Sequence, residues 1–484
     1  MKIIILIAVV LVLLLFIKWA FLPWFPYRRL PHHRTRHMRL RLHLRLHPGP
    51  GHATVVELWL RWGRLACFRR SGRARRSMPF WERVLASTRE YSILVGRGHY
   101  RHALRLPLEE HAVVKSPPRG GKTGWLASVI LHYPGPVIST TTKHDVFELT
   151  SGIRARRGPV HVFNPQGVGN VPSTFRWNPL EGCEDPATAI RRADAFASSV
   201  TQKGVEDATF WASKASDYLR AYFHAAALAN LDLRHVARWV TSGPSTEAER
   251  ILIDLAEPGG HQWAAQLAEL RGEANKTAQT IKMTMSRALA FLADPALAAA
   301  VVPVPGHSLN LERFLRERGT LYLIAESRGE DAPVAPLFAC LASELHYTAA
   351  LLGSRMPGGR LDPPLLMALD EVTQICPVPL PSWLADSGGK GIQIITACQL
   401  GALHFGQGQP RARAAGGVAA AAQVEDDGGR DDRAPRCPAG LGQPVHHAIS
   451  CGEAERAAAA ENDRAPTNAI WWSHRGRRDA ASCR

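Results

Sequence analysis

Eight residues between a short apolar run and a helical pattern constrain the fold of this chain more than any other feature. Ser116–Thr123 (Ser-Pro-Pro-Arg-Gly-Gly-Lys-Thr) matches the phosphate-loop pattern G-x-x-x-x-G-K-[ST], with serine in place of the first glycine. Such a loop needs a strand before it and a helix after it, because backbone N–H groups and the helix N-terminus bind the phosphates together. Ala112–Val114 is apolar, and the residues after the loop recur at helical spacing, namely Trp125, Leu126, Val129 and Ile130. The alternative is a surface turn that contains Gly-Lys-Thr by chance.

The pattern predicts a role for each part of this loop. Lys122 would contact the β- and γ-phosphates, and the hydroxyl of Thr123 would bind Mg²⁺. Pro117 and Pro118 can fix the backbone where the first glycine is missing. We expect a bound nucleotide to contact Ser116, Pro117, Pro118, Arg119, Gly120, Gly121, Lys122, Thr123 and Gly124.

A second motif lies far downstream and would supply the other half of a hydrolase. Pro363–Leu369 is an apolar strand pattern that ends in Asp370 and Glu371. An acid at the carboxyl end of such a strand can hold Mg²⁺ beside a nucleotide, and a second acid can deprotonate an attacking water. We expect Asp370 to be the metal ligand and Glu371 the general base. The alternative is a core strand that ends in two solvated acids.

A third strand pattern, Gly391–Cys398, ends in a neutral amide. Gln399 could hydrogen-bond the γ-phosphate or the attacking water if this strand lies beside the one that ends in Asp370. Taken alone, Gln399 would be an ordinary residue at a strand end. Its place after the phosphate loop and the two acids favours a catalytic role, together with Lys122 and Glu371.

Strand patterns alternate with helical patterns from about residue 106 to 405, which is typical of an α/β fold with a parallel sheet. Residues 185–300 differ, because they are rich in Ala, Leu, Arg and Glu with helical periodicity. We therefore predict a nucleotide-binding domain in two parts, 106–184 and 301–405, with an all-α domain inserted at 185–300. Further strands of the sheet are expected from Val137 and Ile138 toward Thr140, at residues 160–163 and at residues 320–325.

The net charge of +17 is concentrated in one segment. Residues 28–105 contain 19 arginines, no lysine and only three acids. Within them, Arg39–His47 alternates cationic and apolar residues like a half-buried strand. We interpret residues 25–105 as a basic juxtamembrane region. For the cationic face of Arg39–His47, we favour contact with anionic lipid headgroups over contact with DNA. We find no helix-turn-helix spacing, zinc finger or aromatic-basic strand motif, so any DNA contact is expected to be independent of sequence.

The first residues predict a membrane anchor. Ile3–Ile17 is continuously apolar, and the run continues past Lys18 to Leu22, which is long enough to span a bilayer. A cleaved signal peptide is the alternative, but no small-residue cleavage site follows. The arginines after this segment place the rest of the chain in the cytoplasm. We therefore predict a single-pass inner-membrane protein anchored by residues 1–24.

The last part of the chain, residues 406–484, lacks Phe, Tyr, Met and Lys and is dominated by Ala, Gly, Arg and Asp. Such a composition cannot bury enough apolar surface to fold. It indicates either a disordered tail or an out-of-frame translation, and we favour the second. The eight cysteines of the whole chain are scattered without a C-x-x-C pair, so neither a zinc site nor a disulfide framework is expected.

Taken in order, these motifs resemble those of the type IV secretion coupling proteins, the membrane-anchored ATPases of conjugative DNA transfer. The resemblance covers about residues 106–404 and departs from the family at Ser116, in having one anchor helix, and in lacking the final sheet elements after Leu403. It rests on the segments Ser116–Thr123, Pro136–Lys143 with Asp145, Val162–Pro165, Phe175–Leu180, Phe210–Trp211, Leu369–Val372 and Thr396–Gln399.

The resemblance implies a RecA-like P-loop NTPase core that binds ATP and Mg²⁺ between the subunits of a homo-hexamer. The helical insert would receive DNA with its relaxase and pass it to the type IV secretion channel. Arg119 could contact phosphate or a neighbouring subunit, and Arg328 is a weak candidate for an arginine finger. Two alternatives remain: a double-stranded DNA translocase of the chromosome-partitioning type, and a membrane receptor that binds DNA or relaxase without hydrolysing ATP.

Overall fold

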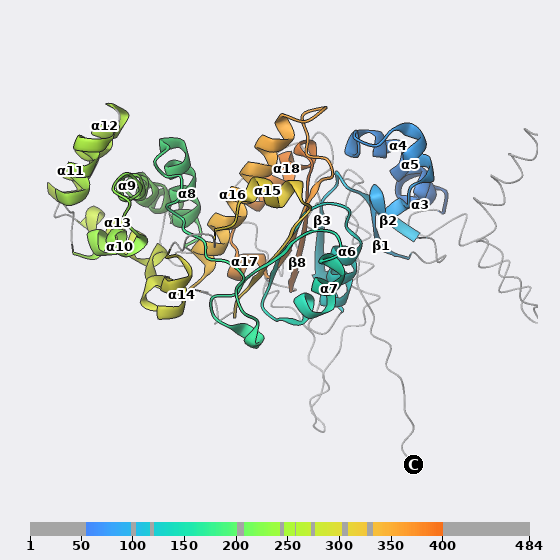
Figure 1. Cartoon of the computed structure of the whole chain (residues 1–484), viewed down its shortest axis with the longest axis horizontal. Helices are drawn as coiled ribbons and strands as arrows, with labels where there is room; N and C mark the ends of the chain where they lie inside the picture. The colour runs from blue at the N-terminus through green and yellow to red at the C-terminus, as the bar shows by residue number, and fades with distance from the viewer. Residues whose placement is uncertain are drawn as a thin grey trace, which may run out of the picture. The chain divides into compact units, whose positions relative to one another are not determined.

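A six-stranded parallel sheet forms the centre of the computed structural model, in the order β3-β8-β7-β4-β6-β5 (Figure 1). The α/β class and the parallel sheet predicted from the sequence are therefore confirmed. The strands are β3 (Ala112–Ser116), β4 (Val137–Thr141), β5 (Val160–Phe163), β6 (Thr320–Ile324), β7 (Leu365–Asp370) and β8 (Ile392–Gln399). The structure describes residues 55–97, 103–116, 121–200, 208–242, 246–256, 258–272, 276–302, 308–326 and 333–399. From Leu58 on, these residues belong to one compact unit.

Both faces of the sheet are buried, which explains why its strands have apolar runs and not an alternation with polar residues. Successive residues of one strand enter opposite cores: Tyr322 packs in one hydrophobic cluster, and Leu321 and Leu323 pack in the other. Helices α6 (Lys122–His132) and α7 (Asp145–Arg154) contribute to the Tyr322 side. The opposite side is covered by α15 (Leu311–Arg316), α16 (Ala335–Ser354), α17 (Val372–Ile375) and α18 (Leu380–Lys390).

A buried arginine ties α7 to the sheet. Arg154 is fully buried and donates to Thr320 Oγ1 at 2.7 Å, to the Tyr133 carbonyl at 2.7 Å and to the Gly135 carbonyl at 2.8 Å. Burial lowers its pKa to about 10, with the Arg157 charge acting in the same direction. The guanidinium is thus held by neutral oxygens, and it fixes the end of α7 against the start of β4 and β6.

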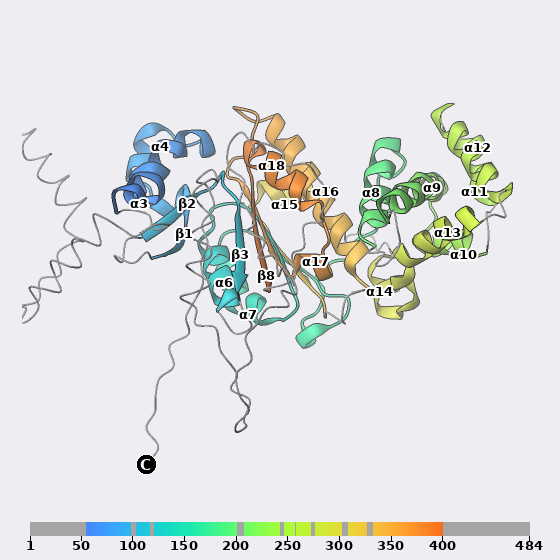
Figure 2. The same ribbon diagram turned by 180° about the vertical axis from the view of Figure 1, so that it is seen from behind.

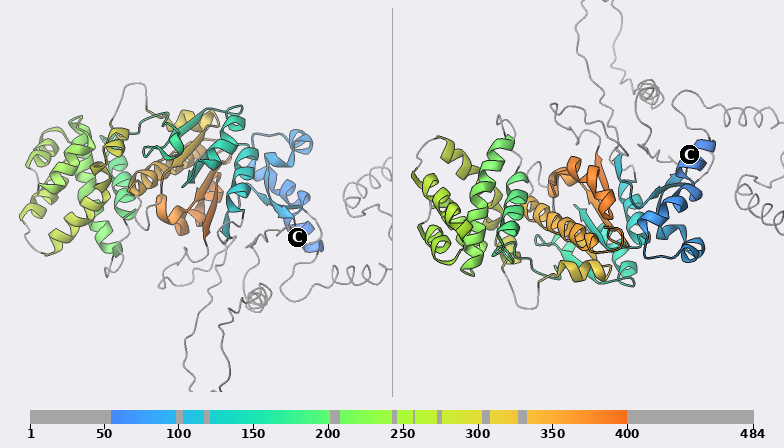
Figure 3. Two further views of the ribbon diagram at one scale, coloured as in Figure 1. Left: turned by 90° about the horizontal axis from the view of Figure 1, so that it is seen from below. Right: turned by 90° about the horizontal axis from the view of Figure 1, so that it is seen from above.

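Between β5 and β6 the described residues form helices and no strands. The long helices α8 (Pro186–Ser198) and α9 (Ala208–Leu228) pack on each other, with their Phe196 and Phe223 rings 5.3 Å apart. Helices α10 (Leu233–Thr241), α11 (Thr246–Leu255), α12 (Pro258–Gly272) and α13 (Lys276–Ala288) pack around α9, and Figure 3 shows this helical group in green and yellow-green. The 3-10 turn η5 (Ala290–Ala293) and α14 (Pro295–Ala300) follow them, and the turn η4 (Val168–Asn170) precedes α8.

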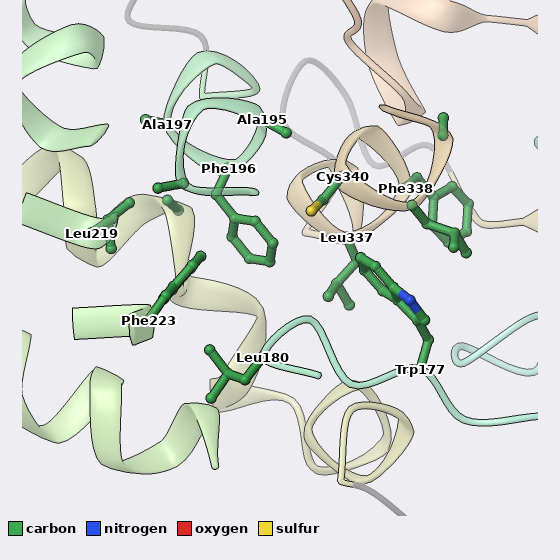
Figure 4. Close-up of a cluster of buried hydrophobic side chains, with 14 of the residues drawn as sticks. Trp177, Leu180, Ala195, Phe196, Ala197, Leu219, Phe223, Leu337, Phe338 and Cys340 are labelled. Atoms are coloured by element: carbon green, nitrogen blue, oxygen red, sulfur yellow. The ribbon is translucent and has the colours of Figure 1, made fainter. Parts of the chain in front are cut away.

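The helical insert is joined to the sheet layer through one buried seam. Trp177 lies against Leu337 of α16, beside the Phe196–Phe223 pair of the insert (Figure 4). Arg192 of α8 donates to the Pro179 carbonyl at 2.7 Å and lies 3.4 Å from a carboxylate oxygen of Glu344 on α16. We call this group of side chains the insert seam.

A second, smaller layer precedes the phosphate-loop strand. It contains α3 (Val55–Trp62), α4 (Arg64–Ala74), α5 (Phe80–Leu85), the turn η3 (Thr88–Glu90) and the antiparallel pair β1 (Ser92–Arg97) and β2 (Ala103–Pro107). Arg75, only 4% exposed, joins this N-terminal layer to the sheet through Asp362 Oδ1 at 2.8 Å. It also donates to the backbone and side chain of Glu90. We call these contacts the N-terminal seam.

Several predicted segments lie outside the described residues: the anchor at 1–24, the alternating segment Arg39–His47 and the tail at 406–484. Among the described helices, only α16 is long and apolar enough to cross a membrane by length and composition. Its most apolar window is 67% buried, and it packs in the core beneath the sheet. The core position of α16 accounts for its apolar character.

Candidate nucleotide-binding site

The phosphate-loop segment begins and ends as its motif requires. Ser116 is the last residue of β3, and Lys122 is the first residue of α6. Gly121 caps α6 with φ of 83°, a left-handed conformation that glycine adopts without strain. Figure 2 shows α6 near β3 and β8, at the sheet end where these strands terminate. Pro117, Pro118, Arg119 and Gly120 lie outside the described residues.

Lys122 meets both predicted acids. Its Nζ lies 2.8 Å from Asp370 Oδ1 and 2.5 Å from Glu371 Oε1. All three side chains are largely buried, with exposed fractions of 14%, 7% and 8%. The structure thus brings together residues separated by 249 positions in the sequence. Thr123 and Gly124 follow in the first turn of α6, where Thr123 is half-buried and Gly124 exposed.

The close contact of these charges changes two pKa values. Burial alone lowers the pKa of Lys122, but its hydrogen bonds to Asp370 and Glu371 and their negative charges raise it above the usual value. Burial raises the pKa of Asp370, and the nearby Glu371 adds to this, although Lys122 opposes it. The ammonium is therefore held in its charged form, while the carboxyl of Asp370 is a poorly solvated group that a second cation would stabilise.

The backbone of Glu371 is strained. It has φ of 48° and ψ of 41°, a left-handed conformation uncommon for a residue with a β-carbon. Its N–H donates to the Ala397 carbonyl of β8 at 3.0 Å, which fixes the turn between β7 and α17. Strain of this kind persists where surrounding contacts hold it, and it aims Glu371 toward Lys122.

Gln399 ends β8, which lies between β3 and β7. In the strand register, Ser116 is opposite Gln399, and Asp370 is opposite Ala397. The carboxyl ends of the three strands thus meet at one edge of the sheet, as their parallel order requires. The backbone of Gln399 is therefore near the phosphate loop and the two acids.

The donor set at this edge fits Mg²⁺. Asp370 Oδ1 is buried and, apart from its ion pair with Lys122, has no hydrogen-bond partner of good geometry among the described residues. Two carboxylates and the Thr123 hydroxyl are hard oxygen donors, which Mg²⁺ prefers, and Mg²⁺ usually takes its remaining ligands from phosphates and water. The described residues contain no group of three or more His, Cys, Asp or Glu that could hold a metal by themselves. The arrangement suits a metal shared with a nucleotide.

Two residues at this edge had no role assigned from the sequence. Thr140, fully buried in β4, donates its hydroxyl to the Asp370 carbonyl at 2.9 Å and so fixes the end of β7. Trp125 of α6 donates its ring N–H to the Val95 carbonyl of β1 at 2.8 Å. A polar run at the end of an apolar strand, as in Thr140–Thr141, is a signal that could have identified the first residue.

A profile described as "Type IV secretory system Conjugative DNA transfer" matches residues 70–399. No curated protein shows significant similarity to the chain. Among solved structures, the unbound bacterial conjugative coupling protein TrwBdeltaN70 is 15% identical with a TM-score of 0.44, covering 61% of this chain and 64% of that one. TrwB in complex with the ATP analogue ADPNP is 17% identical with a TM-score of 0.43, covering 60% and 64%.

A third solved structure, VirB4 of Thermoanaerobacter pseudethanolicus, is 14% identical with a TM-score of 0.30, covering 64% of this chain and 77% of that one. The chain spans less than two thirds of the length of the solved coupling proteins it matches. The profile match covers more than half of the chain and includes the phosphate loop, the acid pair and Gln399. The chain belongs to the type IV secretory system conjugative DNA transfer family.

Proposed function

We propose that the chain is an ATPase that couples a relaxase–DNA substrate to a type IV secretion channel. The observation that carries the proposal is the contact of Lys122 with Asp370 and Glu371 at the carboxyl edge of a parallel sheet, in a chain of the conjugative DNA transfer family. Where P-loop proteins hydrolyse nucleoside triphosphates, a lysine binds the β- and γ-phosphates and a nearby acid holds Mg²⁺, which requires these residue types at one site. TrwB has been solved with ADP and Mg²⁺ and with ADPNP, which supports ATP and Mg²⁺ as the ligands here.

In this proposal each residue has one task. Lys122 leaves the acids and contacts the β- and γ-phosphates, while the backbone of Ser116–Gly124 surrounds them. Thr123 and Asp370 hold Mg²⁺, which neutralises charge on the phosphate oxygens when it is bound. Glu371 accepts a proton from the attacking water, and Gln399 hydrogen-bonds that water or the γ-phosphate. The loop residues Pro117, Pro118, Arg119, Gly120 and Gly121 complete the phosphate cradle.

The rest of the chain would serve the transport of DNA. The helical insert, proposed as a separate domain at 185–300, receives DNA with its relaxase, and contact with DNA is independent of sequence. Six copies form a ring with ATP between subunits, and the segment at 1–24 anchors each copy in the inner membrane with its bulk in the cytoplasm. The arginine-rich segment at residues 28–105 and the match to a secretion family support this placement.

Two single substitutions test the enzyme. Lys122→Ala and Glu371→Gln should each lower ATP hydrolysis by at least about 100-fold, because each removes a group that acts on the phosphates or the water. Lys390→Ala and Glu312→Gln are matched controls, since both residues lie in exposed ion pairs on other helices. Unchanged hydrolysis in the two site variants would overturn the proposal.

The same proteins separate the two alternative functions. Stimulation of ATP hydrolysis by single-stranded but not double-stranded DNA favours conjugative coupling, and the reverse favours a chromosome-partitioning type of translocase. A folded chain that binds nucleotide and never releases phosphate would instead be a receptor for DNA or relaxase. DNA transfer by the Glu371→Gln chain then distinguishes a receptor, which retains transfer, from a motor, which loses it.

A further inference from the structure

An exposed apolar face lies on α5, in the N-terminal layer. Trp81 is 73% exposed, Leu85 86%, Phe80 53% and Val84 41%. Phe80 and Val84 are one helical turn apart, and so are Trp81 and Leu85, so the four side chains lie on one side of the helix. Single exposed apolar residues are ordinary on protein surfaces, but four on one side of a short helix form a patch. We call these four residues the α5 patch.

The α5 patch is held in place by the helix beneath it. The Phe80 ring meets the Phe68 ring of α4 edge to face, with centroids 6.0 Å apart. Arg83 extends over Phe80 and reaches the Ser71 hydroxyl, which is buried in α4. With Phe80 fixed against α4, Trp81 and Leu85 remain exposed on α5, which lies beside α4 in Figure 1.

Exposed arginines lie on or directly after α4, the helix that packs against α5. Arg69 and Arg73 lie one turn apart on the outer face of α4, and Arg76 follows the helix end, all three exposed. The acids near them are already engaged: Glu90 and Asp362 pair with Arg75, and Glu110 pairs with Arg70. Glu82 is the one exposed carboxylate in residues 58–97. The surface around α5 is thus both apolar and strongly cationic.

We propose that the α5 patch and the arginines Arg69, Arg73 and Arg76 dock on the surface of an anionic lipid bilayer. Tryptophan and leucine enter the zone between headgroups and acyl chains, while arginines beside them bind the headgroup phosphates. Each cation near a negatively charged leaflet adds to the attraction. DNA would satisfy the arginines but leave Trp81 and Leu85 in water. The proposal does not depend on the nucleotide site or on ATP hydrolysis.

The test uses the full chain in vesicles with a photo-crosslinking residue, p-benzoylphenylalanine, at a single position. Vesicles contain either phosphatidylglycerol with phosphatidylethanolamine or phosphatidylcholine alone. Position 81 is the probe, and position 253 on α11, where Ile253 is 57% exposed, is the control. A third position, 14, lies in the predicted anchor and reports insertion of that segment independently.

We expect lipid adducts at position 81 to exceed those at position 253 by about tenfold in the anionic vesicles, and to fall in phosphatidylcholine. Arg69→Gln with Arg73→Gln should remove most of the difference between the two lipids. Adducts at position 14 without adducts at position 81 would overturn the docking proposal and leave the anchor intact. Adducts from position 81 to a second copy or to added DNA would equally overturn it.

A second measurement covers the case in which the bulky crosslinker disturbs α5. Trp81→Ser with Leu85→Ser leaves the buried side of the layer untouched, so its circular dichroism and melting temperature should match those of the unmodified chain. Bromine-labelled phosphatidylglycerol should quench the tryptophan fluorescence of the unmodified chain more than that of this variant. Equal quenching of the two proteins would contradict the proposal.

Discussion

The helical insert and the N-terminal layer both pack on the sheet, yet their charges differ greatly. The N-terminal layer, residues 55–107, contains 12 arginines and three acids, whereas residues 185–300 contain 12 basic and 13 acidic residues. In the insert, several arginines are paired with acids, as Arg192 with Glu344 in the insert seam and Arg238 with Glu247 on the surface. The excess charge of the chain therefore indicates a contact made by the N-terminal layer and says little about DNA at the insert.

The two regions are also joined to the sheet in different ways. Each seam centres on one buried arginine and a carboxylate, Arg192 with Glu344 and Arg75 with Asp362. The insert seam is surrounded by aromatic and aliphatic side chains, as Figure 4 shows around Trp177. Two half-buried histidines lie outside both seams: His111 accepts a hydrogen bond from the Ile394 N–H of β8, and the His346 ring of α16 stacks on Trp383 of α18. Stability measurements can compare the two seams directly.

The largest effect is expected at the insert seam. Arg192→Met removes an ion-pair partner of Glu344, whose carboxylate stays buried among apolar groups. The change also removes hydrogen bonds to the Pro179 and Glu181 carbonyls. Loss of one partner of a buried ion pair costs about 3–5 kcal/mol of unfolding free energy. Urea unfolding followed by circular dichroism measures this, with Arg238→Met as an exposed control. A loss no larger than that of the control would show that the seam is held by apolar packing alone.

The N-terminal seam should respond slightly less. Arg75→Met removes the partner of Asp362, but the Ser77 N–H still donates to that carboxylate, so we expect a loss of about 2–3 kcal/mol. A double-mutant cycle with Asp362→Asn isolates the pair. If the losses of unfolding free energy in the two single variants add up to the loss in the double variant, Arg75 and Asp362 do not interact, and other contacts hold the N-terminal layer on the sheet.

Acid should loosen β8 around His111 and the packing of α18 on α16 around His346. Burial lowers the pKa of His111 to about 4, and its Nδ1 accepts a hydrogen bond from the Ile394 N–H at 3.0 Å, so the folded state holds it neutral. Burial, with a further contribution from Lys390, lowers the pKa of His346 to about 4. The unfolded chain binds protons at these histidines near pH 6.5, so stability is lost as pH falls from about 6.5 to 4.

Hydrogen exchange measured between pH 6.5 and 4 tests this expectation, after correction for the intrinsic pH dependence of exchange. Protection of β8 near Ile394 should fall, while protection of α8 stays constant. His111→Asn keeps an acceptor at a similar place and lacks the titration, so it should remove part of the pH dependence. Equal loosening of α8 would mean that acid acts on the whole fold.

The smallest effect concerns the contact between the N-terminal layer and α6. Trp125→Phe keeps the ring in its cluster and removes the hydrogen bond to the Val95 carbonyl, which is worth about 1 kcal/mol. Because the bond lies one turn after Lys122, ATP affinity measured by calorimetry should fall slightly as well. Trp239→Phe, which loses a bond to Glu247 within the insert, controls for the loss of an indole N–H. If Trp125→Phe and Trp239→Phe change ATP affinity equally, the hydrogen bond of Trp125 does not affect nucleotide binding.

Local patterns were sufficient to predict the parallel sheet and to place the phosphate loop and the Asp370–Glu371 pair at the ends of its strands. Apolar runs identify strands buried on both faces, and parallel order brings their carboxyl ends to one edge. The composition of the N-terminal layer indicates one uniform basic segment, although Arg75 is buried in the N-terminal seam and Arg69 is exposed on the surface. The neighbouring sequence cannot show which of the two arginines is buried, because the partner of Arg75 is 287 residues away in the sequence. The ion pairs of Lys122 could not be read from a motif that describes only its contacts with phosphate.

The strand order has a consequence for the way this protein folds during synthesis. Among the described strands, β3 pairs with β8 alone. The strand that precedes the phosphate loop therefore cannot join the sheet until residues 392–399 have left the ribosome. At about 5–20 residues per second this interval is roughly 15 to 60 seconds. The helical insert is translated within it and can fold from local contacts while β3 is still unplaced. Ribosome pausing between β6 and β8 would therefore prolong the exposure of an apolar strand whose partner does not yet exist.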